Sequence, residues 1–288
     1  MKDRIAGFHT ISRRYLIDIL TDIKNRNMEI GERFNKIYKK NNCDYIKSTN
    51  EFKDDVEVKR LIDELSESHP YWNIKIEILE AILRKIEGNT PENFYSLSQI
   101  KESVIHSCHE SEIDGRKHFD ISDEVKIEIC NAEKKKFYEY INNICEEDLI
   151  NAAPLFYRRA LSENEISEIK RKIHAVCYKP GLEKEMTLCF KEEDLKIEIG
   201  SDEIINILRQ QETSQIYEIN TGGIGTASYI MDLSVFDPYY IDGFDIYWCT
   251  EQLDWVIIKD HEGYYYFYGE WLINEIKKAW REWEESVL

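Results

Sequence analysis

The chain has 288 residues, of which 42% are hydrophobic, so it can bury the core of one large domain or of two smaller ones. Its 38 basic and 56 acidic residues give a formal net charge of −18. A field of that sign repels the phosphate backbone of DNA and RNA and attracts cations, so we expect a protein partner and no direct nucleic-acid binding.

The cysteines and the apolar runs bear on the location of the protein. Seven cysteines stand at wide, irregular intervals, which fits reduced thiols better than a disulfide framework. The opening segment lacks the apolar stretch of an export signal, and no apolar run is long enough to span a membrane. These features predict a cytoplasmic protein with no membrane partner.

The first half of the chain has the periodicity of helices. Apolar residues recur at three- and four-residue steps from Thr10 to about Lys40, in a pattern that a polar stretch at residues 25–27 interrupts. Two further helices are expected at Val56–Leu65 and Trp72–Ile86, separated by a stretch that ends at Pro70, a residue suited to opening a helix.

Two more helices are expected before residue 150. One covers about Leu97–Cys108, and the other begins after Ser122, whose hydroxyl can cap it. The alternation at Val125, Ile127 and Ile129 would also suit a strand. We therefore expect residues 1–150 to form a mostly helical domain.

The helices and strands of the second half begin after an apolar segment that contains Pro154. Ser162 and Glu165 have the spacing of a capping box, which predicts a helix that ends at Cys177. Strands are then expected at Met186–Phe190 and Leu195–Ile199. This alternation of element types places a domain boundary at residue 151.

Beyond a short helix at Ser201–Gln210, hydrophobic residues alternate with period two until a helical stripe begins at Leu272. We expect residues 151–288 to form an α+β domain with an aromatic-rich antiparallel sheet. The whole chain is predicted to be α+β, with a helical N-terminal region followed by a C-terminal antiparallel β-meander packed against a terminal helix. The expected meander strands are Gln215–Ile219, Ala227–Leu233, Phe244–Thr250, Trp255–Lys259 and Tyr264–Tyr268.

Aromatic side chains concentrate in the last strands and the last helix. Sixteen of the chain's 35 aromatic residues fall between Tyr229 and Trp283. Because successive strand residues face opposite sides, the run Tyr264–Tyr268 presents rings on both faces of its strand. One interpretation is a strand buried under the final helix and the N-terminal helices; the other is an aromatic contact surface with an acidic rim. That surface would comprise Trp248, Asp254, Trp255, Asp260, Glu262, Tyr264, Tyr266, Tyr268 and Glu270.

Two groups of residues are candidates for metal or acid–base chemistry. The densest cluster of histidine and cysteine, at His106, Cys108, His109 and His118, lacks the ligand spacing of a zinc module, so an ordinary helical or surface cluster is the default interpretation. The run Asp260–Glu262 places His261 between two carboxylates, where it could act as a base or a ligand. A turn before Gly263 explains that run more simply.

Two further patterns are only loosely similar to known catalytic or binding motifs. The glycine-containing run Asn220–Gly225 follows a predicted strand, but it matches neither the P-loop nor the dinucleotide fingerprint, so a hairpin turn is expected. Asp114, Glu124 and Lys126 have the residue types of a metal-dependent nuclease, a class that the negative charge disfavours. We expect no cofactor and assign no catalytic residue.

Two segments, Pro154–Glu165 and Trp248–Trp271, resemble segments of poorly characterised bacterial proteins, some of them immunity proteins of toxin systems. The resemblance lies in the C-terminal half and includes no motif that assigns a role to a residue. It implies a cytoplasmic protein that neutralises a toxin by covering its working surface.

These observations together predict a non-enzymatic, protein-binding inhibitor of the immunity or antitoxin type, which holds a basic toxin domain against an acidic aromatic surface. Two alternatives stay open. One is a metal-dependent enzyme, hydrolase-like or nuclease-like, that uses the histidine cluster or the turn at residues 260–262. The other is a structural subunit of a bacterial defence assembly.

Overall fold

The computed structural model describes residues 2–40, 56–113, 121–178, 187–211, 213–222, 227–239 and 245–288. The chain divides into two compact units, Met1–Pro154 and Leu155–Leu288, which we call the helical unit and the sheet unit. The boundary predicted from the sequence falls between residues 150 and 151. Each unit has its own buried core, so each is described by itself.

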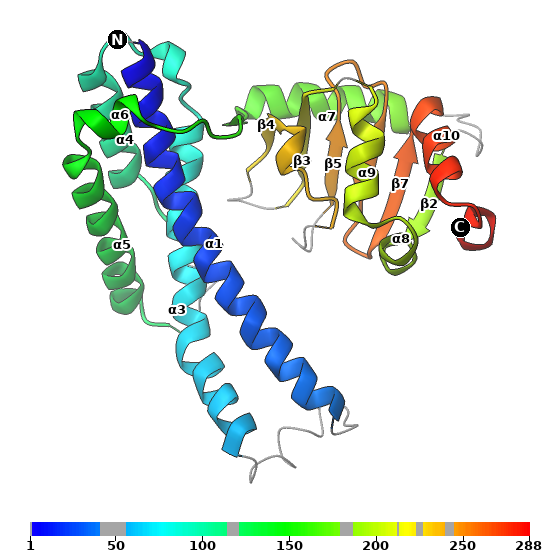
Figure 1. Cartoon of the computed structure of the whole chain (residues 1–288), viewed down its shortest axis with the longest axis horizontal. Helices are drawn as coiled ribbons and strands as arrows, with labels where there is room; N and C mark the ends of the chain where they lie inside the picture. Colours follow the sequence, from blue (N-terminus) through cyan, green and yellow to red (C-terminus); the bar gives the residue numbers. More distant parts are fainter. Residues whose placement is uncertain are drawn as a thin grey trace. The chain divides into compact units, whose positions relative to one another are not determined.

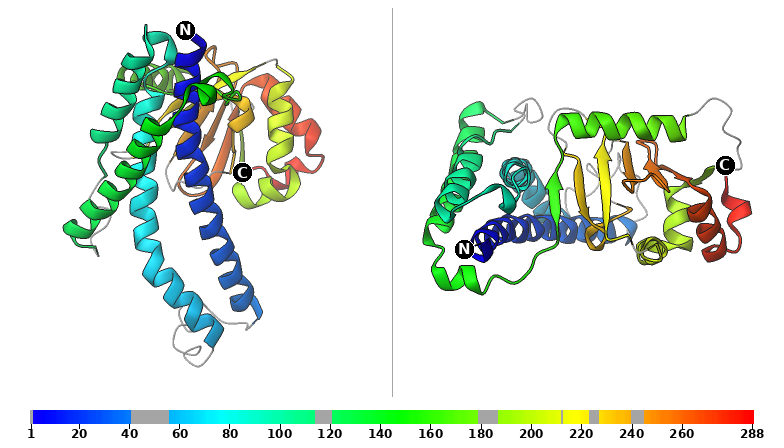
Figure 2. Two further views of the ribbon diagram at one scale, coloured as in Figure 1. Left: turned by 60° about the vertical axis from the view of Figure 1, so that its left-hand side comes forward. Right: turned by 90° about the horizontal axis from the view of Figure 1, so that it is seen from above.

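The helical unit is organised around two long helices that lie side by side (Figures 1 and 2). Shorter helices pack along one end of this pair. Their buried aliphatic and aromatic side chains form one core, to which Leu16, Ile82 and Phe137 contribute with no exposed surface. The helices are α1 (Lys2–Lys40), α3 (Val56–Glu87), the 3₁₀ turn η1 (Pro91–Asn93), α4 (Leu97–His109), α5 (Asp123–Asn143) and α6 (Glu146–Ile150).

A buried ion pair ties α1 to the last turn of α3. Both Nε and Nη2 of Arg13 lie 3.0 Å from Oε1 of Glu87. Next to this pair, His9 Nε2 lies 3.3 Å from the carbonyl oxygen of Ile86, and burial is the main reason that the pKa of His9 is lowered to about 4. His9 is therefore neutral at physiological pH.

The structure corrects two expectations about the long helices. The helix α1 continues through residues 25–27, and α3 continues through Pro70, where a break was predicted. An interior proline removes one helical hydrogen bond, but the side-by-side pairing of α1 and α3 favours one continuous helix over two. The expected helix at Leu97–Cys108 and the cap at Ser122 are confirmed, and residues 125–129 lie in helix α5.

The sheet unit contains, in the described residues, a seven-stranded antiparallel sheet with the order β1-β4-β3-β5-β6-β7-β2. Its two edge strands, β1 and β2, come first in the chain, and the central strands come last. The strands are β1 (Arg158–Ala160), β2 (Thr187–Lys191), β3 (Gln215–Asn220), β4 (Tyr229–Asp232), β5 (Ile246–Cys249), β6 (Val256–Lys259) and β7 (Tyr264–Tyr268).

Helices cover both faces of this sheet, so the unit has three layers (Figure 2). The single helix α7 (Glu163–Cys177) packs on one face through Ile173 and Cys177. The opposite face carries the larger core, formed with α8 (Glu192–Glu198), α9 (Gly200–Arg209) and α10 (Glu270–Ala279), and with the short α11 (Trp283–Ser286) at its margin.

The α+β class and the order of its parts are confirmed. Each of the five predicted meander segments contains a strand, and the capping box of Ser162 and Glu165 starts α7 as expected. The prediction of a strand at Leu195–Ile199 is wrong, because residues 195–198 form the end of α8 and Ile199 is its C-cap. Leu195 and Ile199 point into the core, whereas Ile197 between them is 79% exposed, which is the spacing of a helix.

Candidate partner-binding site

The two tryptophans predicted to contact a partner belong to the core. Trp248 and Trp255 are both 0% exposed and pack in the core under α9 and α10. The rings of Trp248 and Phe236 pack in a T-shaped arrangement with their centroids 5.4 Å apart, and Trp248 Nε1 donates a hydrogen bond of 2.9 Å to Glu218. The prediction that these rings line an outer surface is therefore wrong. Replacing Trp255 by alanine would destabilise the fold by about 3–5 kcal/mol, so it is unsuitable as a binding variant.

The tyrosines of β7 alternate between the two covered faces. Tyr265 is buried on the α9 and α10 face, whereas Tyr266 and Tyr268 lie on the face that α7 covers. Tyr268 is buried; Tyr264 and Tyr266 are half-buried. The strand is thus covered on both faces. The face opposite the final helix is covered by α7, whereas the interpretation from the sequence placed the N-terminal helices there.

The four predicted acidic residues lie at two separate ends of the sheet. Asp254 precedes β6, and Asp260 and Glu262 follow it. Glu270 follows β7, which runs antiparallel to β6, so it lies at the same end as Asp254. Asp254, Glu262 and Glu270 are exposed and Asp260 is half-buried. These carboxylates therefore do not form one continuous rim.

The turn at residues 260–263 is held by its own hydrogen bonds. Asp260 Oδ1 accepts from the backbone N–H groups of Glu262 at 3.0 Å and Tyr264 at 2.8 Å. His261 Nδ1 lies 2.9 Å from Asp245 Oδ1, and this hydrogen bond is the main reason that the pKa of His261 is raised. The carboxylate of Asp260 thus stabilises the turn, as turn chemistry predicts.

The histidine cluster does not converge in the described part of the chain. His106 and His109 are exposed on α4, and the His109 ring lies 5.9 Å from the Tyr138 ring. His118 lies outside the described residues, as do Asp114 and residues 223–225 of the glycine-containing run Asn220–Gly225. Within the described ranges, no three His, Cys, Asp or Glu side chains are grouped closely enough to hold a metal ion.

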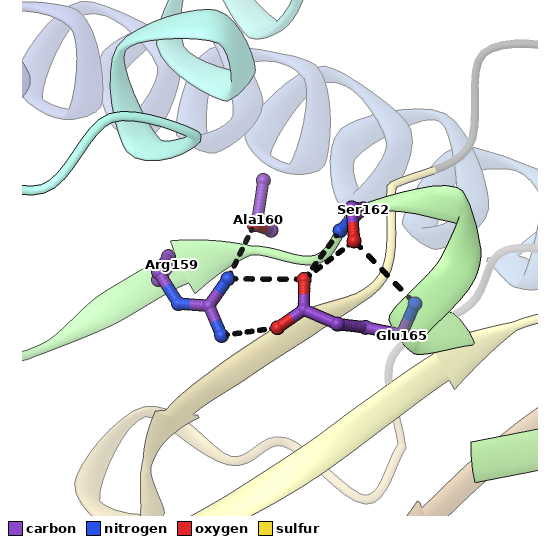
Figure 3. A network of polar contacts seen from close by, with 4 residues as sticks. All are labelled: Arg159, Ala160, Ser162 and Glu165. Atoms are coloured by element: carbon purple, nitrogen blue, oxygen red, sulfur yellow. Dashed lines mark hydrogen bonds and ion pairs between the residues drawn. The ribbon is translucent and has the colours of Figure 1, made fainter. Parts of the chain in front are cut away.

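A compact polar network joins β1 to the first turn of α7 (Figure 3). Arg159 donates through both Nη atoms to the two carboxylate oxygens of Glu165, at 2.8 and 3.2 Å. Glu165 Oε2 also accepts from the backbone N–H and the hydroxyl of Ser162, at 2.8 and 2.7 Å. The hydrogen bonds from Arg159 are the largest cause that lowers the pKa of Glu165 to about 2. The network fixes the start of α7 against the sheet edge.

Beside this network is a hollow of about 160 Å³, which we call the α7 hollow. It lies between α7, β3 and the loop that joins β5 to β6. Its apolar lining consists of Ile169 and Leu253, both packed against the core beneath α7. Its polar lining has three carboxylates and one ammonium group. The lining residues are Glu165, Glu168, Ile169, Lys172, Tyr217, Thr250, Glu251 and Leu253.

Glu251 and the Tyr217 hydroxyl differ from the other polar groups of the lining, because they have no ion-pair or hydrogen-bond partner among the described residues. Glu168 is paired with Lys172 at 2.9 Å on the exposed side of α7. By contrast, no described residue forms an ion pair with Glu251 or a hydrogen bond with the Tyr217 hydroxyl. Burial, and then the charge of Glu251, raises the pKa of Tyr217. The hollow thus offers, in its lining, the exposed carboxylate of Glu251 and the half-buried phenol of Tyr217.

Sequence reasoning missed this hollow, because its walls come from segments far apart in the chain. The sequence did show the capping box of Ser162 and Glu165. The pairing of Arg159 with Glu165, however, depends on β1, a strand of three residues that the hydrophobic pattern did not predict. Asp254, which was predicted, lies next to the hollow in the same loop and donates its backbone N–H to Thr250 Oγ1 at 3.2 Å.

These features define an α+β protein with a three-layered sheet unit and an acidic hollow on its α7 side. No family model matches the chain, and no curated protein or solved structure matches it either. In the part of the chain that the structure describes, no helix is long and apolar enough to cross a membrane.

Proposed function

We propose that the protein is a non-enzymatic, protein-binding inhibitor of the immunity or antitoxin type, and that its sheet unit holds a basic partner domain. The observation that carries the proposal is the charge of this unit. Between residues 155 and 288 there are 14 basic and 26 acidic residues, a net charge of −12, against −6 for residues 1–154. Such a surface speeds the encounter with a basic domain and disfavours acidic competitors.

The contact is proposed to use exposed carboxylates, because Trp248 and Trp255 are buried and cannot reach a partner. Asp254 and Glu270 supply them at one end of the sheet and Glu262 at the other. An inhibitor of this kind needs no catalytic group of its own, since covering the working surface of the partner is sufficient.

The test starts with the product of the adjacent reading frame as the first candidate partner, followed by capture from the host with the tagged full chain. We expect a stoichiometric partner with a net positive charge, whose growth-inhibiting effect is relieved when this chain is co-expressed. The complex should weaken as ionic strength rises from about 0.1 M to about 1 M, where the Debye length falls from about 10 Å to about 3 Å.

Two single charge reversals locate the contact. Asp254→Lys and Glu262→Lys change an exposed carboxylate at opposite ends of β6 and leave the core untouched. We expect at least one of them to slow association with the partner. An acidic partner, a complex insensitive to salt, or full protection by both variants would contradict the proposal.

A further inference from the structure

We infer that the α7 hollow receives an arginine side chain of the basic partner, an inference that rests on the proposed function and gives it a specific contact. The size of the hollow suits one side chain. A cavity of about 150 Å³ accommodates a ring of benzene size, and the hollow measures about 160 Å³. A guanidinium with part of its methylene stem is an occupant of that size.

The lining matches both parts of an arginine side chain. Ile169 and Leu253 provide apolar surface for the methylenes, as long cationic side chains favour. Tyr217 on β3 lines the hollow and is half-buried, so the part of its ring that borders the hollow is available for stacking by a planar cation. Its hydroxyl, which no described residue engages, can accept a hydrogen bond from the guanidinium.

The carboxylates of the lining have different roles. Glu165 is already held by Arg159 and Ser162, so it shapes the wall and does not turn toward a ligand. Glu251 is exposed in the β5–β6 loop and makes no ion pair with any described residue, although its charge acts on the nearby Lys172, so it is the principal acceptor for an incoming cation. Glu168 can exchange its exposed partner Lys172 for a guanidinium that arrives beside it.

Arginine suits this arrangement better than lysine. Glu251 and Glu168 come from a loop and a helix on different sides of the hollow, so a ligand must direct donors to both. The five N–H donors of a guanidinium form a planar fork that can do this while one face stacks on Tyr217, whereas an ammonium is a point charge.

The first experiment tests the hollow without the partner. N-acetyl-arginine amide is titrated into the full chain and followed by methyl and ring NMR signals of Ile169, Leu253 and Tyr217, with the lysine and glutamate analogues as comparisons. We expect saturable shifts with the arginine probe at millimolar concentration, weaker binding of the lysine probe, and no shifts with glutamate. Shifts that do not saturate, or equal binding of lysine and arginine, would overturn the inference.

Matched variants assign the binding to the lining. Glu251→Lys should abolish binding of the arginine probe, and Tyr217→Phe should weaken it several-fold. Glu284→Lys makes the same charge change on α11, away from the hollow, and should leave binding unchanged. Retained binding by Glu251→Lys, with its NMR spectrum otherwise that of the wild type, would also overturn the inference.

The second experiment separates this inference from the proposed function. With the purified partner, Glu251→Lys should weaken the complex at least about tenfold and Glu284→Lys should not. A complex that forms normally with Glu251→Lys would refute the arginine contact and leave the inhibitor proposal standing. Absence of any partner would refute the inhibitor proposal, while the probe titration would still report on the hollow.

Discussion

Glu165→Gln is the variant that most directly tests how the sheet unit is held together. The carboxylate of Glu165 joins Arg159 on β1 to the cap of α7. Glutamine at this position of a capping box can still accept from the backbone N–H of Ser162. The substitution therefore removes the charge that pairs with Arg159 and retains the capping geometry.

The expected loss is about 1–2 kcal/mol in the free energy of unfolding. A pKa lowered from 4.5 to about 2 would correspond to roughly 3.5 kcal/mol at about 1.4 kcal/mol per pH unit. The side chain of Glu165 is 39% exposed, however, so solvent screens the interaction and only part of that energy is realised. The two-pronged geometry with Arg159 keeps the value above that of a typical surface pair.

The pH dependence follows from the direction of the shift. Because the pKa of Glu165 is lower in the folded chain than in the unfolded chain, its stabilising contribution is fully present above about pH 4.5 and is lost as the pH falls toward 2. The difference between the wild type and Glu165→Gln should therefore be largest at pH 7 and should fall to about half or less at pH 3.

Urea unfolding followed by tryptophan fluorescence measures this difference, because five of the six tryptophans lie in the sheet unit. Glu163→Gln is the matched control, since it removes a carboxylate from the same turn of α7 without touching Arg159. A variant as stable as the wild type, or an equal loss at pH 7 and pH 3, would refute the reasoning.

Two further substitutions test close packing and buried charge. Gly269→Ala should destabilise the sheet unit by about 2–4 kcal/mol, because φ is +104° and an added Cβ would collide with the backbone that leads into β6. Gly263→Ala, where φ is +85° but the nearest atom is 3.9 Å away, should cost only about 1–2 kcal/mol in the same urea assay; equal losses would argue against the collision. Glu87→Gln should destabilise the helical unit by about 3–5 kcal/mol in urea unfolding followed by circular dichroism, because Arg13 is left buried without its counter-charge. Glu80→Gln removes the surface ion pair with Lys24 and should cost under about 1 kcal/mol. A similar loss in Glu87→Gln and Glu80→Gln would show that the burial of the Arg13–Glu87 pair does not determine the cost.

Local signals in the sequence predicted much of the secondary structure. The caps at Ser122 and Ser162 marked the starts of two helices, because a capping hydroxyl acts within three residues. The segment 195–199 was wrongly predicted as a strand because apolar residues at 195, 197 and 199 alternate with polar ones. The same five residues also fit a helical turn in which only Leu195 and Ile199 face the core. Tertiary packing of Leu195, which the sequence does not display, decided between the two.

The candidate site was harder to predict than the fold. Alternation along Tyr264–Tyr268 shows that rings face both ways, but it does not show what covers each face, and α7 arrives from about 90 residues earlier in the chain. The burial of Trp248 and Trp255 follows from that covering. Likewise, the α7 hollow forms only because the sheet order places β3 beside β5, which brings together Tyr217, Glu251 and Glu168 in its lining.

The strand order also affects how the sheet unit forms during synthesis. The edge strands β1 and β2 emerge first, yet they pair with β4 and β7, through contacts such as Arg158 with Met231 and Thr187 with Tyr268, which are 73 and 81 residues apart. Closing such long loops is slow, and until β7 is made, β2 has no strand to pair with and α7 has only part of its sheet to cover. The nascent unit therefore exposes apolar strands to solvent until β7 has left the ribosome, and chaperone binding during synthesis is the expected consequence.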